Sequence, residues 1–504
     1  MRKNVSSRKK NPARRIGMLA GSALAILFSC IFMPAGAKAV TVSKSLQSYG
    51  EYLKKSDQIN QIFSPTSMNS AFYMNSLMLE DEDKAKFDAF LENKNYLKIE
   101  NSSALKSVNR IWVNSVQPVY LPASLSEVGY SLDMSQSVSA TAEKNEYVKT
   151  QTDGFIPSTP TTFDINTIMD VMNIVYFKDS WKGGDRVVDG SHTTFQNSDG
   201  TVTQNVNFIR QYSDNTEKDQ VSFYSTDKAH ACTIGYENGC NFTIVLPDSG
   251  YELKDVDLQP FMGNTAKEVT DQVIFSMPEF CINTTFQPSF SDFDLPNAKV
   301  RKEIYNGDQV NSIIQVAKIQ VDRSGTEAAA VTEILKVSSA LPVQEPFQMI
   351  CDRPFYYYIS DAKNDEILFM GKLEKYTTDN VPDLTQYEEK KAEEEEASEA
   401  FTKKKVTKVK IVAKKNKKKN KKNVRKYSVT WKKIKDANGY EVFYAKNKKF
   451  TKGKKKEILL ANKGKKVLDL KKGSKIFLKV RGYQDASKGK IYTNWSKIQK
   501  VKVK

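Results

Sequence analysis

Histidine and cysteine are scarce in this chain, and their scarcity excludes several kinds of site. The 504 residues include only two histidines, His192 and His230, with no CxxC pair and no histidine cluster, so no metal site is predicted. Beyond residue 40 four cysteines remain, too few to form the framework of so large a protein. Cys232 and Cys240 flank a predicted turn, and the sequence leaves open whether they form a disulfide or remain free thiols.

Catalytic motifs and long apolar runs are missing as well. The chain has no GxSxG, no HExxH, no phosphate-binding glycine loop and no histidine-based triad, the groups on which common catalytic sites are built. Aspartate and glutamate are numerous but spread as on an acidic surface, which leaves a hidden glycosidase-like pair as the enzymatic alternative. Beyond residue 40 no apolar run is long enough to cross a membrane. We therefore predict neither an enzyme nor a cofactor.

The N-terminus has the parts of a secretory signal. Residues 2–15 are basic, residues 16–33 are apolar, and Ala37-Lys38-Ala39 offers a small-x-small cleavage site before Val40. A membrane anchor is the alternative, but Pro34 and the cleavage site favour removal. We expect residues 1–39 to be a signal peptide and the mature chain to be secreted.

Charge is divided between an acidic body and a basic end. Residues 40–400 carry 31 basic and 54 acidic side chains, whereas residues 401–504 carry 38 basic and 5 acidic ones. The basic end predicts salt-sensitive attraction to an anionic polymer of the cell envelope, which would keep the secreted protein at the cell surface. A soluble module with a charged surface is the alternative. Nucleic acid is not expected, because no helix-turn-helix or RNP-like aromatic motif is present.

Hydrophobic periodicity predicts mixed α and β structure up to about residue 377. Helical spacing covers residues 43–55 and 68–78. Strands are predicted at 108–113, 273–277, 313–321, 355–359 and 367–370, and a hairpin over 232–247 closes at Asn238-Gly239. The apolar run 173–177 is typical of a strand buried on both faces.

Composition changes abruptly after this region. Residues 378–404 are charged and of low complexity, which predicts a solvated linker or a transient helix. Residues 405–504 alternate apolar and basic side chains, as in a small antiparallel sandwich. The spacing from Trp431 to Gly439-Tyr440, and the closing Arg481-Gly482-Tyr483 with Trp495-Ser496, resemble the fibronectin type III-like modules of bacterial surface and secreted proteins.

Four motifs in the first part of the chain resemble those of the serpin family, and they occur in the same order. Residues 173–182 (NIVYFKDSWK) match the family's long-strand signature, and residues 352–359 with 367–373 match its C-terminal strand pair. Residues 63–67 (FSPTS) are similar to its shutter serine motif, and residues 325–332 stand where the hinge of its reactive loop begins. The resemblance spans about residues 41–376, so we assign a serpin domain to residues 40–377.

The resemblance implies an α+β fold with three sheets, about eight helices and an exposed reactive loop. Serpins trap serine proteases, and sometimes cysteine proteases, as a covalent acyl complex. The cut loop then inserts as a new strand in the central sheet, which requires a folded state held by a kinetic barrier. We expect a monomeric inhibitor of this kind. The alternative is a non-inhibitory serpin-fold binding protein, or a cell-surface adhesion module.

The predicted hinge consists mainly of small residues, which lose little entropy on ordering. It comprises Gly325, Thr326, Glu327, Ala328, Ala329, Ala330, Val331 and Thr332. On insertion the alternate positions Thr326, Ala328, Ala330 and Thr332 would face the interior, and none is bulky or charged. The hinge therefore favours an active inhibitor.

The family's spacing from hinge to cut bond places the reactive bond at Ser339–Ala340, to within a few residues. A small residue before the cut bond suits a protease with a shallow primary pocket, either elastase-like or subtilisin-like. Lys336 would instead attract a trypsin-like protease, but a cut there would leave only a short segment to insert. We favour the bond after Ser339.

The chain departs from the family pattern at three places. Arg323 stands where many members have Glu, so the usual salt bridge at the top of the insertion site is in doubt. Gln315 replaces a common shutter histidine, and we expect it to hydrogen-bond Asn173; Ser64 and Ser67 complete the predicted shutter. The stretches 78–107 and 285–312 are short, which predicts trimmed peripheral helices and no heparin-like activating site.

Overall fold

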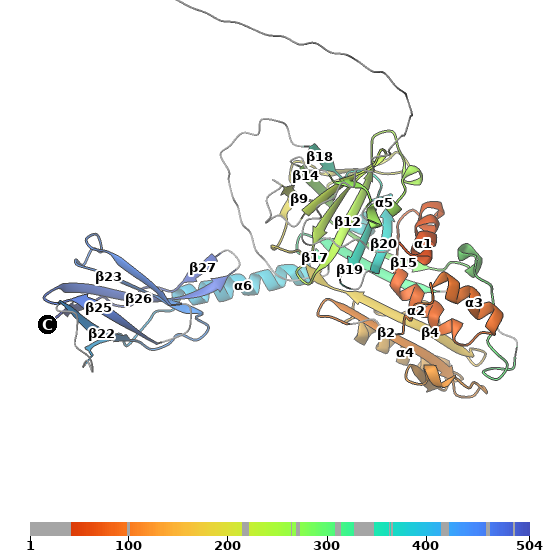
Figure 1. Ribbon diagram of the computed structural model, residues 1–504, viewed down its shortest axis with the longest axis horizontal. Helices are drawn as coiled ribbons and strands as arrows, with labels where there is room; N and C mark the ends of the chain where they lie inside the picture. Colours follow the sequence, from red (N-terminus) through yellow and green to blue (C-terminus); the bar gives the residue numbers. More distant parts are fainter. Residues whose placement is uncertain are drawn as a thin grey trace, which may run out of the picture. The chain divides into compact units, whose positions relative to one another are not determined.

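The computed structural model describes most of the chain beyond the predicted signal (Figure 1). The described residues are 42–97, 101–213, 221–263, 265–268, 273–307, 314–326, 347–361, 363, 366–414, 423–459, 464–486 and 489–504. Within these ranges no helix combines the length and the apolar character needed to span a membrane.

Both helices expected near the start of the chain are present, but the total is lower than predicted. In the described part of residues 42–377 the α-helices are α1 (Lys44–Lys55), α2 (Pro65–Ser76), α3 (Asp81–Phe90), α4 (Ser137–Gln151) and α5 (Gln259–Met262). The expectation of about eight helices was therefore wrong. Among the described residues between α2 and Leu105 the only helix is α3, and among those between Phe286 and Gln315 the only helical element is a 3-10 turn, Phe290–Phe293.

Three sheets build the domain, and the predicted strands overlap strands of these sheets. The seven-stranded sheet has the order β1 (Gln61–Phe63), β20 (Glu366–Leu373), β19 (Phe355–Asp361), β12 (Cys240–Pro247), β11 (Ala229–Gly235), β10 (Val221–Ser225) and β13 (Lys267–Glu268). The four-stranded sheet has the order β18 (Phe347–Ile350), β14 (Val273–Pro278), β9 (Phe208–Ser213) and β6 (Val187–Val188). A small ribbon of β7 (Thr194–Gln196) and β8 (Val202–Gln204) lies apart from them. The predicted hairpin is β11 and β12, whose turn holds Gly239 at φ 92°, a value that favours glycine.

The central sheet is divided into two ladders. One has the order β3 (Gly129–Leu132), β2 (Leu105–Asn114) and β4 (Met169–Phe177). The other has the order β15 (Phe280–Phe286), β16 (Gln315–Asp322), β17 (Gly325–Thr326) and β5 (Asp179–Ser180). Only Lys178 separates β4 from β5 in the chain, so the two ladders continue into one another at this point.

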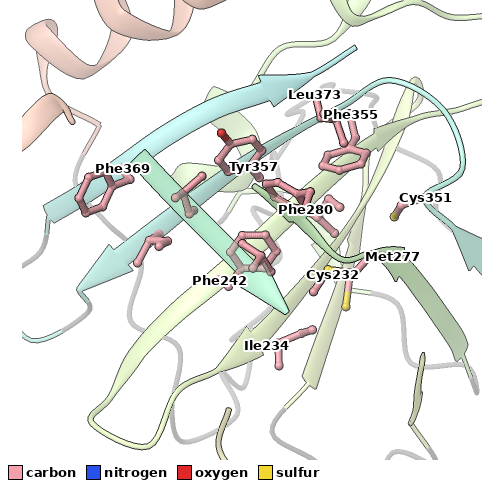
Figure 2. Packing of buried hydrophobic residues seen from close by; sticks show 14 of the residues in the cluster. Cys232, Ile234, Phe242, Met277, Phe280, Cys351, Phe355, Tyr357, Phe369 and Leu373 are labelled. Atoms are coloured by element: carbon pink, nitrogen blue, oxygen red, sulfur yellow. The ribbon is translucent and has the colours of Figure 1, made fainter. Parts of the chain in front are cut away.

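The main core fixes the central sheet to the seven-stranded sheet. Figure 2 shows side chains converging from both sheets, among them Phe242, Phe280, Phe355 and Tyr357. Phe280 belongs to β15, and its ring centroid lies 5.1 Å from that of Tyr357 on β19. Burial of a side chain of this size stabilises the fold by roughly 2–3 kcal/mol.

The C-terminal region is β-rich, as the alternation of apolar and basic residues predicted, and its paired strands are antiparallel. One sheet contains β21 (Lys410–Ala413), β22 (Val424–Thr430) and β25 (Lys465–Lys471). The other contains β24 (Lys455–Leu459), β23 (Gly439–Ala445), β26 (Lys475–Ala486), β27 (Gly489–Tyr492) and β28 (Gln499–Lys502). Inward-facing residues such as Val429, Tyr440 and Leu478 form one core. The fibronectin type III-like assignment stays a prediction.

The segment predicted as a solvated linker contains helix α6 (Thr385–Lys403). Most of its described side chains are exposed and many are charged, as expected, but Phe401 is 1% exposed and belongs to the C-terminal core. The end of α6 is therefore an integral part of that domain.

The four cysteines that the structure describes are free, which is the second of the two alternatives for Cys232 and Cys240. Burial raises the pKa of Cys232 and Cys351 well above the usual thiol value and raises that of Cys240 to about 12. Burial also raises the pKa of Cys281. Because the thiolate is the reactive form, these shifts disfavour reaction of the four thiols in the folded chain.

We expect the chain without residues 1–39 to resist Ellman's reagent at about pH 8 while folded, because only thiolates react. Unfolding it in guanidinium chloride without reductant should release four reactive thiols per chain, one for each free cysteine. The absorbance of the released thiolate measures both states. Two missing thiols in denaturant would reveal a disulfide and contradict the assignment.

Candidate functional site

The central sheet is open between β4 and β16. Strand β4 pairs with β2, and β16 pairs with β15 and β17, but no described strand links β4 to β16. A cavity of about 650 Å³ lies there, lined by residues 169–175 of β4 and residues 315–317 of β16. A strand edge carries unpaired N–H and C=O groups, so this open slot can accept a further strand.

The four predicted shutter residues line this open slot together. Ser64 caps α2: its Oγ accepts a hydrogen bond of 3.2 Å from Ser67 N, and Pro65 occupies the first helical turn. The Gln315 amide accepts a 2.7 Å hydrogen bond from Ser64 N and donates a 3.2 Å one to Ser64 O. The expected hydrogen bond between Gln315 and Asn173 was therefore wrong, because the backbone of Ser64 uses both ends of the glutamine amide.

Asn173 instead belongs to the β2–β4 side of the slot. Its Nδ2 donates to Asn109 Oδ1 at 2.8 Å, and its backbone carbonyl accepts from Ser67 Oγ at 3.2 Å. Its Oδ1 is buried and accepts no hydrogen bond from the described residues. A strand that entered the slot would bring N–H donors to such an acceptor.

The first two residues of the predicted hinge already form a strand at one end of the slot. In β17, Gly325 pairs with Ser180 and Thr326 with Asp179, and both also pair with β16. Thr326 is 3% exposed, and its hydroxyl lies 2.6 Å from the Tyr236 hydroxyl. The remaining hinge residues, Glu327 to Thr332, and the bait residues Ser339 and Ala340 lie outside the described residues.

Glycine is required where this strand begins. Gly325 has φ 146°, and a Cβ atom there would lie 2.3 Å from the carbonyl oxygen of Asp179. Only a residue without a side chain can turn into the space between β16 and β5. Because β17 is antiparallel to β16, a continued strand would run along β16 into the open slot, with alternate side chains on the inward face that Thr326 occupies.

Aromatic packing holds the turn that precedes the hinge. The indole of Trp181 stacks on Tyr236 with ring centroids 4.8 Å apart, and its Nε1 donates to Asp322 O at 2.8 Å. Asp322 in turn accepts hydrogen bonds from the backbone and hydroxyl of Ser324. Burial raises the pKa of both Asp322 and Asp179 above the usual aspartate value.

The salt bridge that Arg323 placed in doubt is present with its charges exchanged. Arg323 Nε lies 2.8 Å from Glu279 Oε1, and its Nη2 lies 2.7 Å from Oε2. The backbone N–H of Arg323 also donates to Glu279, at 2.9 Å. The Glu279 side chain is fully buried, so its charge depends on this bidentate partner.

The start of α6 also contacts the insertion site, which the sequence did not indicate. Tyr387 donates its hydroxyl to Asp185 Oδ2 at 3.0 Å, and Gln320 of β16 donates to Asp383 O at 3.1 Å. Gln320 lies on β16, on one side of β17, and Asp185 lies in the loop after β5, the strand on the other side of β17. The segment 383–387 therefore links β16 to the loop that follows β5.

No group of His, Cys, Asp and Glu side chains within the described ranges is arranged to hold a metal ion. The site is instead built from strand edges, hydroxyls, amides and one buried ion pair. Such groups bind and position a polypeptide strand.

Comparisons with known proteins agree with this geometry. The family model described as Serpin (serine protease inhibitor) matches residues 42–376. An uncharacterized serpin-like protein of Thermococcus kodakarensis is 26% identical over 352 residues, covering 62% of this chain and 80% of its own length. A serine protease inhibitor of the mouse, Mus musculus, is 24% identical over 370 residues, covering 66% of this chain and 82% of its own length.

Solved structures show the same fold. A thermophilic serpin, tengpin, in its native state matches with a TM-score of 0.55 and 18% identity, covering 66% of this chain and 94% of its own. An Arabidopsis serpin in its native stressed conformation matches with a TM-score of 0.53 and 20% identity, covering 66% of this chain and 97% of its own. From the motifs, the divided central sheet and the family match over residues 42–376, this chain belongs to the serpin family.

Proposed function

We propose that this serpin is a secreted suicide inhibitor of serine proteases with elastase-like or subtilisin-like specificity. The observation that carries the proposal is β17: the hinge begins as a strand aligned with an open slot in the central sheet. Several relatives bear the names of serine protease inhibitors, among them the mouse protein. Serpins as a family act mostly as protease inhibitors and not as enzymes.

In the proposed reaction the bond between Ser339 and Ala340 is the bait. The protease serine Oγ bonds to the carbonyl carbon of Ser339, the C–N bond breaks, and the amine of Ala340 leaves with a proton. The chain from Thr326 onward then continues β17 along β16 into the slot. The acyl ester is carried along with it before water can hydrolyse it.

Insertion is favourable because it satisfies groups that are unpaired beforehand. The facing edges of β4 and β16 gain ladder hydrogen bonds, each contributing roughly 1 kcal/mol net. Small hinge side chains at the inward positions enter without a steric or charge penalty, in contrast to the bulky or charged hinges of non-inhibitory members. No comparable feature of the described residues favours the alternative, a non-inhibitory binding protein.

Mixing the mature chain with elastase should give a band of the summed mass that survives boiling in detergent, because the complex is an ester. Elastase whose active-site serine is replaced by alanine is the control and should give no such band. Ser339→Arg should transfer complex formation from elastase to trypsin, if Ser339 precedes the cut bond. Clean cleavage with no complex from any of these proteases would sink the inhibitor proposal.

Thr326→Arg should convert the inhibitor into a substrate. Position 326 is 3% exposed between two strands, and burial of an unpaired charge costs several kcal/mol, so the yield of complex should fall by about tenfold or more. Glu327→Arg is the matched control, since alternation places residue 327 on the outward face. Densitometry of complex and cleaved bands measures both. Equal loss in the two variants would argue against the assigned inward positions.

Arg323→Glu should lower the thermal midpoint of the native state and shorten its inhibitory half-life on warming. It leaves the buried carboxylate of Glu279 unpaired beside a second one, a change that costs about 3–5 kcal/mol. The exchange Arg323→Glu with Glu279→Arg should restore part of this loss, since the ion pair re-forms but the backbone N–H of residue 323 loses its carboxylate acceptor. If the double variant has the same thermal midpoint and inhibitory half-life as Arg323→Glu alone, the two residues do not act as a pair.

A further inference from the structure

The outer face of one C-terminal sheet gathers cations and aromatic rings. Along β26, Ile476, Leu478 and Val480 point into the core, which places the alternate side chains on the other face. Register places residues of β23, β24, β27 and β28 on the same face, and Trp495 packs beside it. We call this the basic-aromatic face: Lys456, Lys475, Lys479, Arg481, Lys490, Lys500 and Lys502 with Phe443, Phe477, Tyr492 and Trp495.

Several of these cations lie over aromatic rings. Arg481 Cζ is 3.7 Å from the ring centroid of Tyr492 and 4.4 Å from that of Trp495. Lys479 Nζ is 4.2 Å from the Trp495 centroid and 4.7 Å from that of Phe450. Cation–π contacts of this kind fix long side chains in place, so the charges are presented in an ordered array.

The two carboxylates on this face are already neutralised. Glu441 is 3% exposed; its Oε2 accepts two hydrogen bonds from Arg481, and Lys456 lies 3.2 Å from its Oε1. Asp485 pairs with Lys490. Lys475, Lys479, Lys500 and Lys502 form no ion pair with a carboxylate in the described parts of the chain.

Two of the unpaired lysines stand opposite one another. Lys475 of β26 is the register partner of Lys502 of β28, and Lys500 stands opposite Phe477 on the same face. Like charges at directly opposed positions destabilise a sheet. A bound polyanion would remove this repulsion, so the face is complementary to negative charge.

We propose that the basic-aromatic face binds an acidic polysaccharide, whose carboxylates pair with the free lysines. A nucleic acid bound without sequence preference stacks its bases on open ring faces, but here cations lie over the rings of Tyr492 and Trp495. Recognition therefore proceeds through charge and hydroxyl contacts along the strands. This inference is independent of protease inhibition, because it involves only the C-terminal domain.

The test uses the full mature chain and polygalacturonate as the probe. Binding measured by calorimetry at low salt should weaken about tenfold when Lys475, Lys500 and Lys502 are all replaced by Gln, the loss expected for three exposed ion pairs. Lys479→Met, which keeps an apolar stem over the rings, should also weaken it. The matched control replaces Lys410, Lys426 and Lys471, exposed lysines of the other sheet, by Gln and should change binding little.

Each outcome of this test either supports the proposal or contradicts it. Thermal midpoints confirm that each variant folds, and the yield of protease complex, measured in parallel, should stay unchanged. Absence of polygalacturonate binding, or equal losses in test and control variants, overturns the proposal. Equal or tighter binding to single-stranded DNA or to phosphatidylserine vesicles would assign the face to that partner instead. Binding to neutral dextran at the same strength would show that charge is not the basis.

Discussion

Two unpaired strand edges facing one cavity are the constraint on which the rest of the serpin domain depends. Proteins normally pair the N–H and C=O groups that strand edges expose. Within the part of the chain that the structure describes, β4 and β16 do not pair with each other, and the buried Oδ1 of Asn173 beside them accepts no hydrogen bond. A third strand would satisfy these groups; in the proposed inhibition the hinge supplies it, which requires a folded state held by a kinetic barrier.

Contacts at both ends of β16 tie it to neighbouring elements, and in the proposed mechanism they would oppose entry of the hinge before cleavage. Near its start, the side-chain amide of Gln315 forms two hydrogen bonds with the backbone of Ser64 at the cap of α2. Just beyond its end, Arg323 binds Glu279 with its guanidinium and its backbone N–H together, so the ion pair also fixes the turn from which the hinge departs. The coupling depends on which residue carries the cation, because only a carboxylate at position 279 can accept the backbone N–H of residue 323 as well as the guanidinium.

Local patterns predicted much of this architecture, and contacts between distant residues account for what they missed. The strands and the β11–β12 hairpin follow from side-chain alternation and turn residues, whereas the hinge was assigned from the resemblance to serpins and stays a prediction. The partner of Arg323 lies 44 residues away, and that of Gln315 lies 251 residues away, so neither could be identified from spacing. The contact of Tyr387 with Asp185 falls in a segment whose composition predicted only a linker. The helix count was too high because the resemblance, and not the periodicity, supplied it.

The C-terminal domain is rich in lysine, and it must fold despite the repulsion between these positive charges. Part of that repulsion is absorbed locally: the rings of Trp495 and Tyr492 cover cationic heads, and Glu441 neutralises Arg481 from beneath. A sheet optimised for stability alone would place opposite charges across its strands. Lys475 and Lys502 instead stand opposite one another, so their repulsion is confined to one face of the sheet. Binding of a polyanion to that face would remove this repulsion. In both domains the described free state leaves an interaction unsatisfied: repulsion between lysines in the C-terminal domain, and strand edges without a partner strand in the serpin domain. In the two proposals a bound polyanion relieves the first and the inserted hinge satisfies the second.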